Sequence, residues 1–141
     1  MTRVAGRWAS GVVVMLAAVG IGLAGVGGCS KPESQAVFEP DGGLLDLKSF
    51  LVAAKASGQS TTQEAAAPVI AAVHLGADYY LRSGQIEYIW GTTLTDGPEA
   101  AGRIVAYQKT TATDGGWALF QDGSLKHLTA AEFAATPRAE P

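Results

Sequence analysis

Cysteine and histidine are scarce in this sequence of 141 residues. Cys29 is the only cysteine, so no disulfide can form within the chain. The two histidines, His74 and His127, have no third ligand at the spacing of a zinc site. We therefore expect no bound metal and no other cofactor.

Basic side chains are also few, and the familiar catalytic motifs are missing. Residues 29–141 contain eight basic and thirteen acidic side chains. Nucleic acids and anionic membrane surfaces select clusters of Lys and Arg, so this balance argues against both as partners. No serine lies in a Gly-x-Ser-x-Gly elbow, and no phosphate loop ends in Gly-Lys-Ser or Gly-Lys-Thr. We expect a protein that is not an enzyme and does not bind nucleic acid.

Residues 1–28 have the pattern of a bacterial export signal. Two arginines precede an uncharged run, Gly11 to Val26, that is short and rich in glycine for a transmembrane helix. The run ends in Val26-Gly27-Gly28-Cys29, which resembles the lipobox of bacterial lipoproteins. That resemblance implies cleavage before Cys29 and a diacylglyceryl lipid on its thiol. The alternatives are an uncleaved anchor and an ordinary signal peptide with a chance cysteine.

The lipobox also implies a location for the mature protein. Two acyl chains anchor a protein stably, whereas a single chain gives only marginal binding. Ser30, rather than an aspartate, follows the cysteine, and by the resemblance this favours the outer membrane, facing the periplasm. The first partner we expect is thus the membrane itself, through the N-terminal lipid.

The remaining chain divides into a spacer, a domain and a tail. Residues 29–43 are rich in Pro, Glu, Ser and Gly and lack periodicity, which predicts a flexible tether. Residues 44–136 carry helix and strand patterns and form one small domain. We expect residues 137–141 to be a loose tail.

Two helices are predicted at the start of the domain. Residues 46–56 place apolar side chains at helical spacing, and Gly58 stops the pattern. A second apolar face runs from Pro68, which suits a first-turn position, to Gly84, which ends the run. Gly76 lies inside this second helix, at a cost of about 1 kcal/mol relative to Ala.

The pattern then changes to that of strands. Residues 86–90 alternate with period two, and residues 104–109 form a second strand. Residues 116–121 and 124–128 form a hairpin, joined by Asp122-Gly123 as a two-residue type I′ turn. That turn places Phe120 opposite Leu125 and Trp117 opposite Leu128.

A short helix follows the hairpin, and it completes an α+β fold. Thr129 and Glu132 have the spacing of a capping box, and Leu128 and Phe133 that of a hydrophobic staple. The expected architecture is two N-terminal helices, a three- to four-stranded antiparallel meander and a short C-terminal helix.

Aromatic residues are numerous for so small a domain. Tyr88, Trp90 and Trp117 lie on predicted strands, where they can pack in the core or form an exposed recognition surface. Burial of all three side chains would remove the second interpretation.

Several segments together resemble a known group of proteins. The segments are Leu81–Gly84, Tyr88–Gly91, Val105–Lys109, Gly115–Gly123 and Lys126–Phe133. They are similar to small uncharacterised exported proteins and lipoproteins of planctomycete-type bacteria, over roughly residues 80–135. The hairpin is also similar to the C-terminal Asp-Gly strand pair of prepilin-like proteins of that group, although the prepilin leader is absent here. The resemblance implies no activity and no site residues.

Two hypotheses about function follow. The first is a lipid-anchored envelope protein without enzymatic activity, which binds another envelope protein or packs into an envelope assembly. The second is a binding module for a small molecule or glycan, which would use Tyr88, Trp90 and Trp117. An enzyme is a third and weaker reading.

Overall fold

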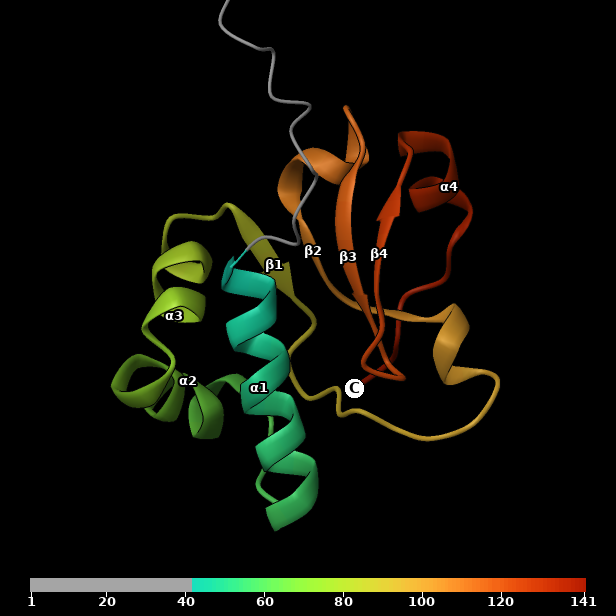
Figure 1. Cartoon of the computed structure of the whole chain (residues 1–141). Coiled ribbons are helices and arrows are strands. Elements are labelled where there is room, and N and C mark those ends of the chain that lie inside the picture. Colours follow the sequence, from blue (N-terminus) through green and yellow to red (C-terminus); the bar gives the residue numbers. More distant parts are fainter. Residues whose placement is uncertain (1–41) are drawn as a thin grey trace, which may run out of the picture. The chain divides into compact units, whose positions relative to one another are not determined.

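The computed structural model describes residues 42–141 (Figure 1). Three helices come first, then four strands, then a last helix. Two short 3₁₀ helices, η1 and η2, precede and follow the second strand. The elements are α1 Gly42–Ser57, α2 Gln63–Val73, α3 Leu75–Arg82, β1 Ile86–Tyr88, η1 Ala100–Gly102, β2 Ile104–Gln108, η2 Lys109–Ala112, β3 Gly116–Phe120, β4 Leu125–Leu128 and α4 Ala130–Ala135.

The four strands form one antiparallel meander in the order β1-β2-β3-β4. Glu87 lies opposite Tyr107 in the first pair, and Trp117 lies opposite His127 in the last. A bulge lies in β2 between Ile104 and Ala106. The helices together with this sheet confirm the α+β class.

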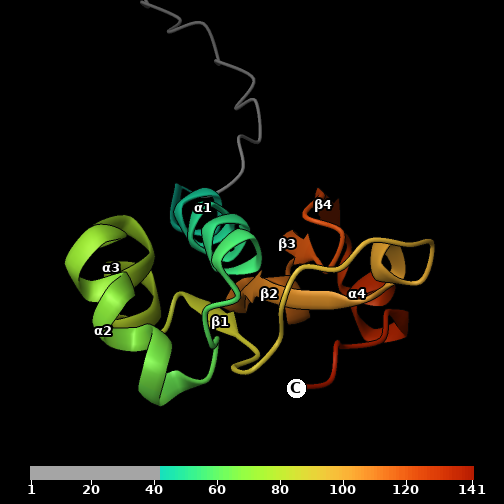
Figure 2. The same cartoon turned by 90° about the horizontal axis from the view of Figure 1, so that it is seen from below.

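Apolar residues cover both faces of the sheet. α1 lies across one face, and α2 and α3 lie beyond β1, on the side away from β2 (Figures 1 and 2). α4 packs on the other face, where Phe133 forms a small cluster with Phe120 and Leu128. The larger core joins α1, α2 and α3 to the first face; its fully buried members include Leu44, Leu47, Phe50, Leu51, Ile70, Val105 and Leu119.

The first helix begins earlier than the sequence pattern indicated. α1 starts at Gly42, so the last two residues of the expected tether, 29–43, belong to the domain. Gly43 is buried against α3, and a Cβ at this position would overlap the Tyr80 ring. The glycine is therefore needed for close helix contact, not for chain flexibility. The export signal, Cys29 and the rest of the tether lie outside the described residues.

The single helix expected from Pro68 onwards is two helices. α2 begins at Gln63 and contains Pro68 in its interior, and the chain breaks at His74, whose φ of −112° and ψ of 65° are not helical. Asp46 on α1 explains the break, because its carboxylate accepts a hydrogen bond from the Ala77 N–H and caps α3. Sequence periodicity alone could not show a cap supplied by another helix.

The hairpin turn also differs from the prediction. The Gly123 N–H donates to the Phe120 carbonyl (2.9 Å), and the Phe120 N–H donates to the Ser124 carbonyl (2.9 Å). This is a three-residue loop in which Gly123 has φ +83°. The extra loop residue shifts the register by one, so Trp117 lies opposite His127 rather than Leu128.

The C-terminal segment is held against the sheet, contrary to the expected loose tail at 137–141. The Ile104 N–H donates to the Pro137 carbonyl (3.0 Å), and the Ala139 N–H donates to the Ile104 carbonyl (2.8 Å). Ala139 is buried, and the Arg138 guanidinium lies 3.9 Å from the centre of the Phe133 ring. These contacts extend the folded domain to residue 139.

Candidate functional site

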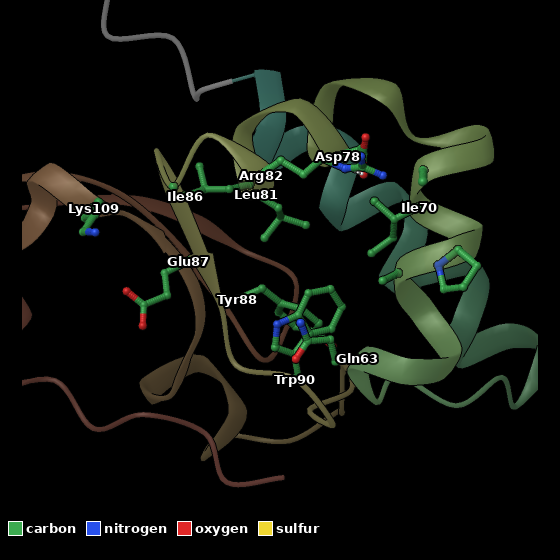
Figure 3. A pocket seen from close by; sticks show the side chains of 14 residues that line it. Gln63, Ile70, Asp78, Leu81, Arg82, Ile86, Glu87, Tyr88, Trp90 and Lys109 are labelled. Carbon is green, nitrogen blue, oxygen red and sulfur yellow. Dashed lines mark hydrogen bonds and ion pairs between the residues drawn. The ribbon is translucent and has the colours of Figure 1, made fainter.

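A groove lies between β1 and the helices α2 and α3 (Figure 3). Its volume is about 770 Å³, within the range of roughly 300–1,000 Å³ that is typical of ligand pockets. The groove lies inside the folded domain and draws on segments more than forty residues apart. Its lining residues are Gln63, Ala67, Pro68, Ile70, Ala71, Asp78, Leu81, Arg82, Gly84, Ile86, Glu87, Tyr88, Trp90 and Lys109.

The apolar part of the groove follows from the periodicity of the elements around it. Ile86 and Tyr88 alternate with exposed Glu87 on β1, so both are directed to the buried face of the strand. Ile70 on α2 is fully buried, and Leu81 on α3 packs against the same core. The floor is thus continuous with the core and well fixed.

Tyr88 is buried at the base of the groove, with 4% of its surface exposed. Its hydroxyl donates to the Thr92 carbonyl (2.6 Å). Burial raises the pKa of this hydroxyl above its ordinary value, and hydrogen bonding with Thr92 and Thr61 offsets part of the rise. Tyr88 therefore stays protonated near neutral pH and forms a fixed wall of the groove.

Trp90 is half-buried and borders the groove. Its ring meets the Tyr88 ring edge to face, with centroids 4.8 Å apart. Such pairs contribute about 0.5–1.5 kcal/mol beyond the area they bury. Tyr88 holds Trp90 in place at the groove, as part of a rigid aromatic pair.

The third predicted aromatic residue lies elsewhere. Trp117 is on β3, where its ring contacts the His127 ring edge to face at 5.5 Å and packs against the larger core. Its indole Nε1 is buried and, within residues 42–141, has no hydrogen-bond partner. The structure therefore unites Tyr88 and Trp90 in one site and separates Trp117 from them.

Charged side chains form the rim of the groove. The Arg82 Nε lies 2.8 Å from an Asp78 carboxylate oxygen, one turn away on α3. The Arg82 side chain is nevertheless 72% exposed, and a guanidinium has five N–H donors. Lys109, the first residue of η2, borders the same space. The groove thus combines an apolar floor with cations that stay accessible.

The sequence did not indicate that α2 forms one wall of the groove. Ala67, Pro68 and Ala71 border the groove, but each resembles an ordinary helix residue in the sequence. Only the positions of α2 and β1 in space bring these residues opposite Trp90. Apart from the aromatic pair, no local sequence signal could have indicated this site.

Two further findings concern the described part of the chain. No helix of residues 42–141 is long and apolar enough to cross a membrane. No three His, Cys, Asp or Glu side chains in that range lie together in a way that could hold a metal ion.

Comparison with known proteins gave no match, whether to family models, to curated proteins or to solved structures. The resemblance to exported planctomycete-type proteins stays a prediction from the sequence.

Proposed function

We propose that this chain is a lipid-anchored protein of the cell envelope that binds another envelope protein in its groove. Cys29 would carry the lipid, at the outer membrane and facing the periplasm. The observation that carries the proposal is the groove itself, with its apolar floor beneath Trp90 and its charged rim at Arg82 and Lys109.

The composition of the groove supports a protein partner. Protein interfaces have apolar, aromatic centres and polar rims, and Trp, Tyr and Arg contribute most of their binding energy. All three residue types border this groove, as Trp90, Tyr88 and Arg82. The Tyr88–Trp90 pair is already fixed by packing, so little side-chain freedom would be lost on binding.

Photo-crosslinking in intact cells tests this proposal. A benzoyl-phenylalanine at Gln63, an exposed position at the rim of the groove, should give one discrete adduct with an envelope protein, identified by mass spectrometry. The same group at Ala65, exposed on the same helix and outside the groove, is the matched control. Identical adducts from both positions, or none from Gln63, would contradict binding in the groove.

A small molecule or glycan is the second candidate ligand, and Trp90 is the observation that favours it. A half-buried indole beside an apolar cavity suits stacking against a sugar ring or another flat ligand. Titration with oligosaccharides should then change the tryptophan fluorescence of the wild type. The change should be lost in Trp90→Phe and kept in Trp117→Phe.

A further inference from the structure

The pairing of β1 with β2 fixes the direction of its backbone groups. The Lys109 N–H donates to the Gln85 carbonyl (2.9 Å), and the Ile89 N–H donates to the Val105 carbonyl (2.9 Å). In an antiparallel pair, residues that bond to the partner strand alternate with residues whose N–H and C=O point the other way. Odd-numbered positions from 85 to 89 therefore face β2.

The even-numbered positions, Ile86 and Tyr88, accordingly turn their backbone groups away from β2. β1 is an edge of the sheet, and no other strand of the described chain pairs with that side. α2 and α3 lie on this side of β1 (Figure 1). The groove lies between β1 and these two helices (Figure 3). The groove thus runs along the edge at which a further strand could add.

The remaining exposed parts of the sheet edges are either paired with another segment of the chain or carry charged side chains. Beyond the end of β1, the chain's own Arg138 pairs with Ile104 as a parallel bridge, so an extended segment occupies that stretch of β2. At the opposite edge, β4 exposes Lys126 and His127, and charged side chains on an edge strand discourage pairing. β1 also exposes one charged side chain, Glu87, but its outer side borders an apolar groove.

The far wall of the groove limits what can bind there. Ala67 and Ala71 are small, and Pro68 has no N–H to give to the helical carbonyl of Glu64. Small side chains leave width beside β1, but α2 and α3 block the approach of a whole second sheet. One extended segment fits this space, whereas the edge of another folded sheet does not.

The charged side chains at the rim indicate which charge a side chain of that segment can carry. Of the two acidic side chains that border the groove, Asp78 pairs with Arg82, and Glu87 bonds to Tyr107 across the strand. Arg82 and Lys109 are the two basic side chains there, so the four charges at this rim sum to zero. Lys109 is nevertheless a cation that has no salt bridge with any acidic residue of the described chain, so an acidic residue of a bound segment can pair with it.

We propose that the groove binds an extended peptide segment of a partner protein, which adds to β1 as a fifth strand and carries an acidic residue close to Lys109. Main-chain hydrogen bonds to Ile86 and Tyr88 supply the strand addition, and alternate apolar side chains of the segment enter the groove. This inference rests on the proposed function, because it specifies how a protein partner occupies the same groove.

Selection from a phage library of random dodecapeptides, against the full-length protein in detergent, tests this inference. Enriched peptides should alternate apolar and polar residues and carry Asp or Glu near one end. Ala67→Phe, which fills the groove, should weaken their binding by about tenfold or more, and Ala65→Phe should leave it unchanged. Circular dichroism of both variants checks that they fold.

Backbone N-methylation of one selected peptide then distinguishes strand addition from other binding. In a strand, every second N–H donates to β1, so methylation at alternate positions should lower the affinity about tenfold and leave the other positions almost unaffected. This readout uses the wild-type protein and needs no folded variant. Lys109→Glu should weaken the acidic peptide and restore binding of its Asp-to-Lys counterpart.

The outcomes separate the two proposals. Selected peptides that lose affinity in Ala67→Phe but show no alternation under N-methylation would overturn strand addition and leave protein binding in the groove intact. If no selected peptide depends on the groove, and crosslinking from Gln63 also fails, both proposals are wrong.

Discussion

Asp46 shows how one side chain organises two helices. One carboxylate oxygen lies 2.8 Å from His74 Nδ1, and the other accepts the Ala77 N–H at 3.1 Å. Burial raises the pKa of this carboxyl, but the hydrogen bonds from His74 and Ala77 outweigh it, so the pKa lies below its ordinary value of 3.8. The charged carboxylate is therefore the form that the fold stabilises.

The first prediction concerns acid stability. A carboxyl group with a depressed pKa stabilises the fold above its unfolded pKa, and this contribution is lost as the pH falls through the folded pKa. Asp46→Asn should lower the unfolding free energy by about 1–2 kcal/mol at pH 7, since hydrogen bonds to charged groups are worth roughly 1.5–3 kcal/mol and the amide keeps part of them. The difference from wild type should shrink between pH 5 and pH 2, roughly the interval around these pKa values.

Urea melts at several pH values measure this difference. Asp114→Asn, at an exposed position between η2 and β3, is the control and should leave the wild-type pH profile in place. A constant gap between Asp46→Asn and wild type down to pH 2 would show that the charge of Asp46 does not contribute.

Two glycines illustrate what residue patterns cannot reveal. A Cβ at Gly76 would lie 3.1 Å from the Asp46 carboxylate, and one at Gly43 would overlap the Tyr80 ring. Both glycines let α1 and α3 approach closely. In the sequence, Gly76 resembled a weak point of a helix, and Gly43 resembled a part of the tether. The residues that these glycines contact, Asp46 and Tyr80, lie about thirty residues away or more along the chain.

At the scale of elements, the second prediction concerns the hairpin turn. Gly123 has φ +83°, and a Cβ there would meet Leu94 at an ordinary 3.6 Å. Space is thus available, and the backbone conformation is the constraint. Gly123→Val should destabilise the domain by about 1–3 kcal/mol, because a β-branched residue is strained at positive φ.

Gly123→Asn is the matched comparison. Asparagine tolerates the left-handed region far better than valine, so its unfolding free energy should fall between those of wild type and Gly123→Val in urea melts. Equal stability of the valine variant and the wild type would mean that the turn is not the three-residue loop described above.

Local signals predicted the last helix well and the hairpin register less well. The Thr129 N–H donates to Glu132 (2.8 Å) and the Glu132 N–H donates to Thr129 (3.2 Å), which confirms the capping box. The box could be predicted because its members are three residues apart. Asp122-Gly123 suits both a two-residue and a three-residue loop, so the register depended on packing that the sequence does not display.

At the scale of the whole molecule, the fold class could be predicted and the site only in part. Helical and strand periodicities are local, and their order along the chain is enough to indicate an α+β meander. The groove requires α2, α3 and β1 to lie side by side, and the break at His74 places α3. Tyr88 and Trp90 were identified as aromatics, but their common position beside α2 is a tertiary property.

The third prediction concerns how the whole protein is placed in the cell. If the groove binds an envelope protein as proposed, the protein must be present where that partner is, and the lipobox-like sequence at residues 26–29 would supply this location. Lipidation needs the Cys29 thiol as its nucleophile. Cys29→Ser should therefore accumulate as a larger, unprocessed precursor, and labelled palmitate fed to the cells should mark the wild type alone.

Ser30→Ala is the matched control, because it changes the neighbouring side chain and keeps the thiol. It should be processed and labelled like the wild type. The two acyl chains would hold the wild type firmly in the membrane fraction, since each buried CH₂ contributes about 0.8 kcal/mol. Equal palmitate labelling of Cys29→Ser and wild type would end the lipoprotein interpretation. The groove would then have to meet its partner without an anchor at Cys29, and its affinity alone would have to keep the two proteins together.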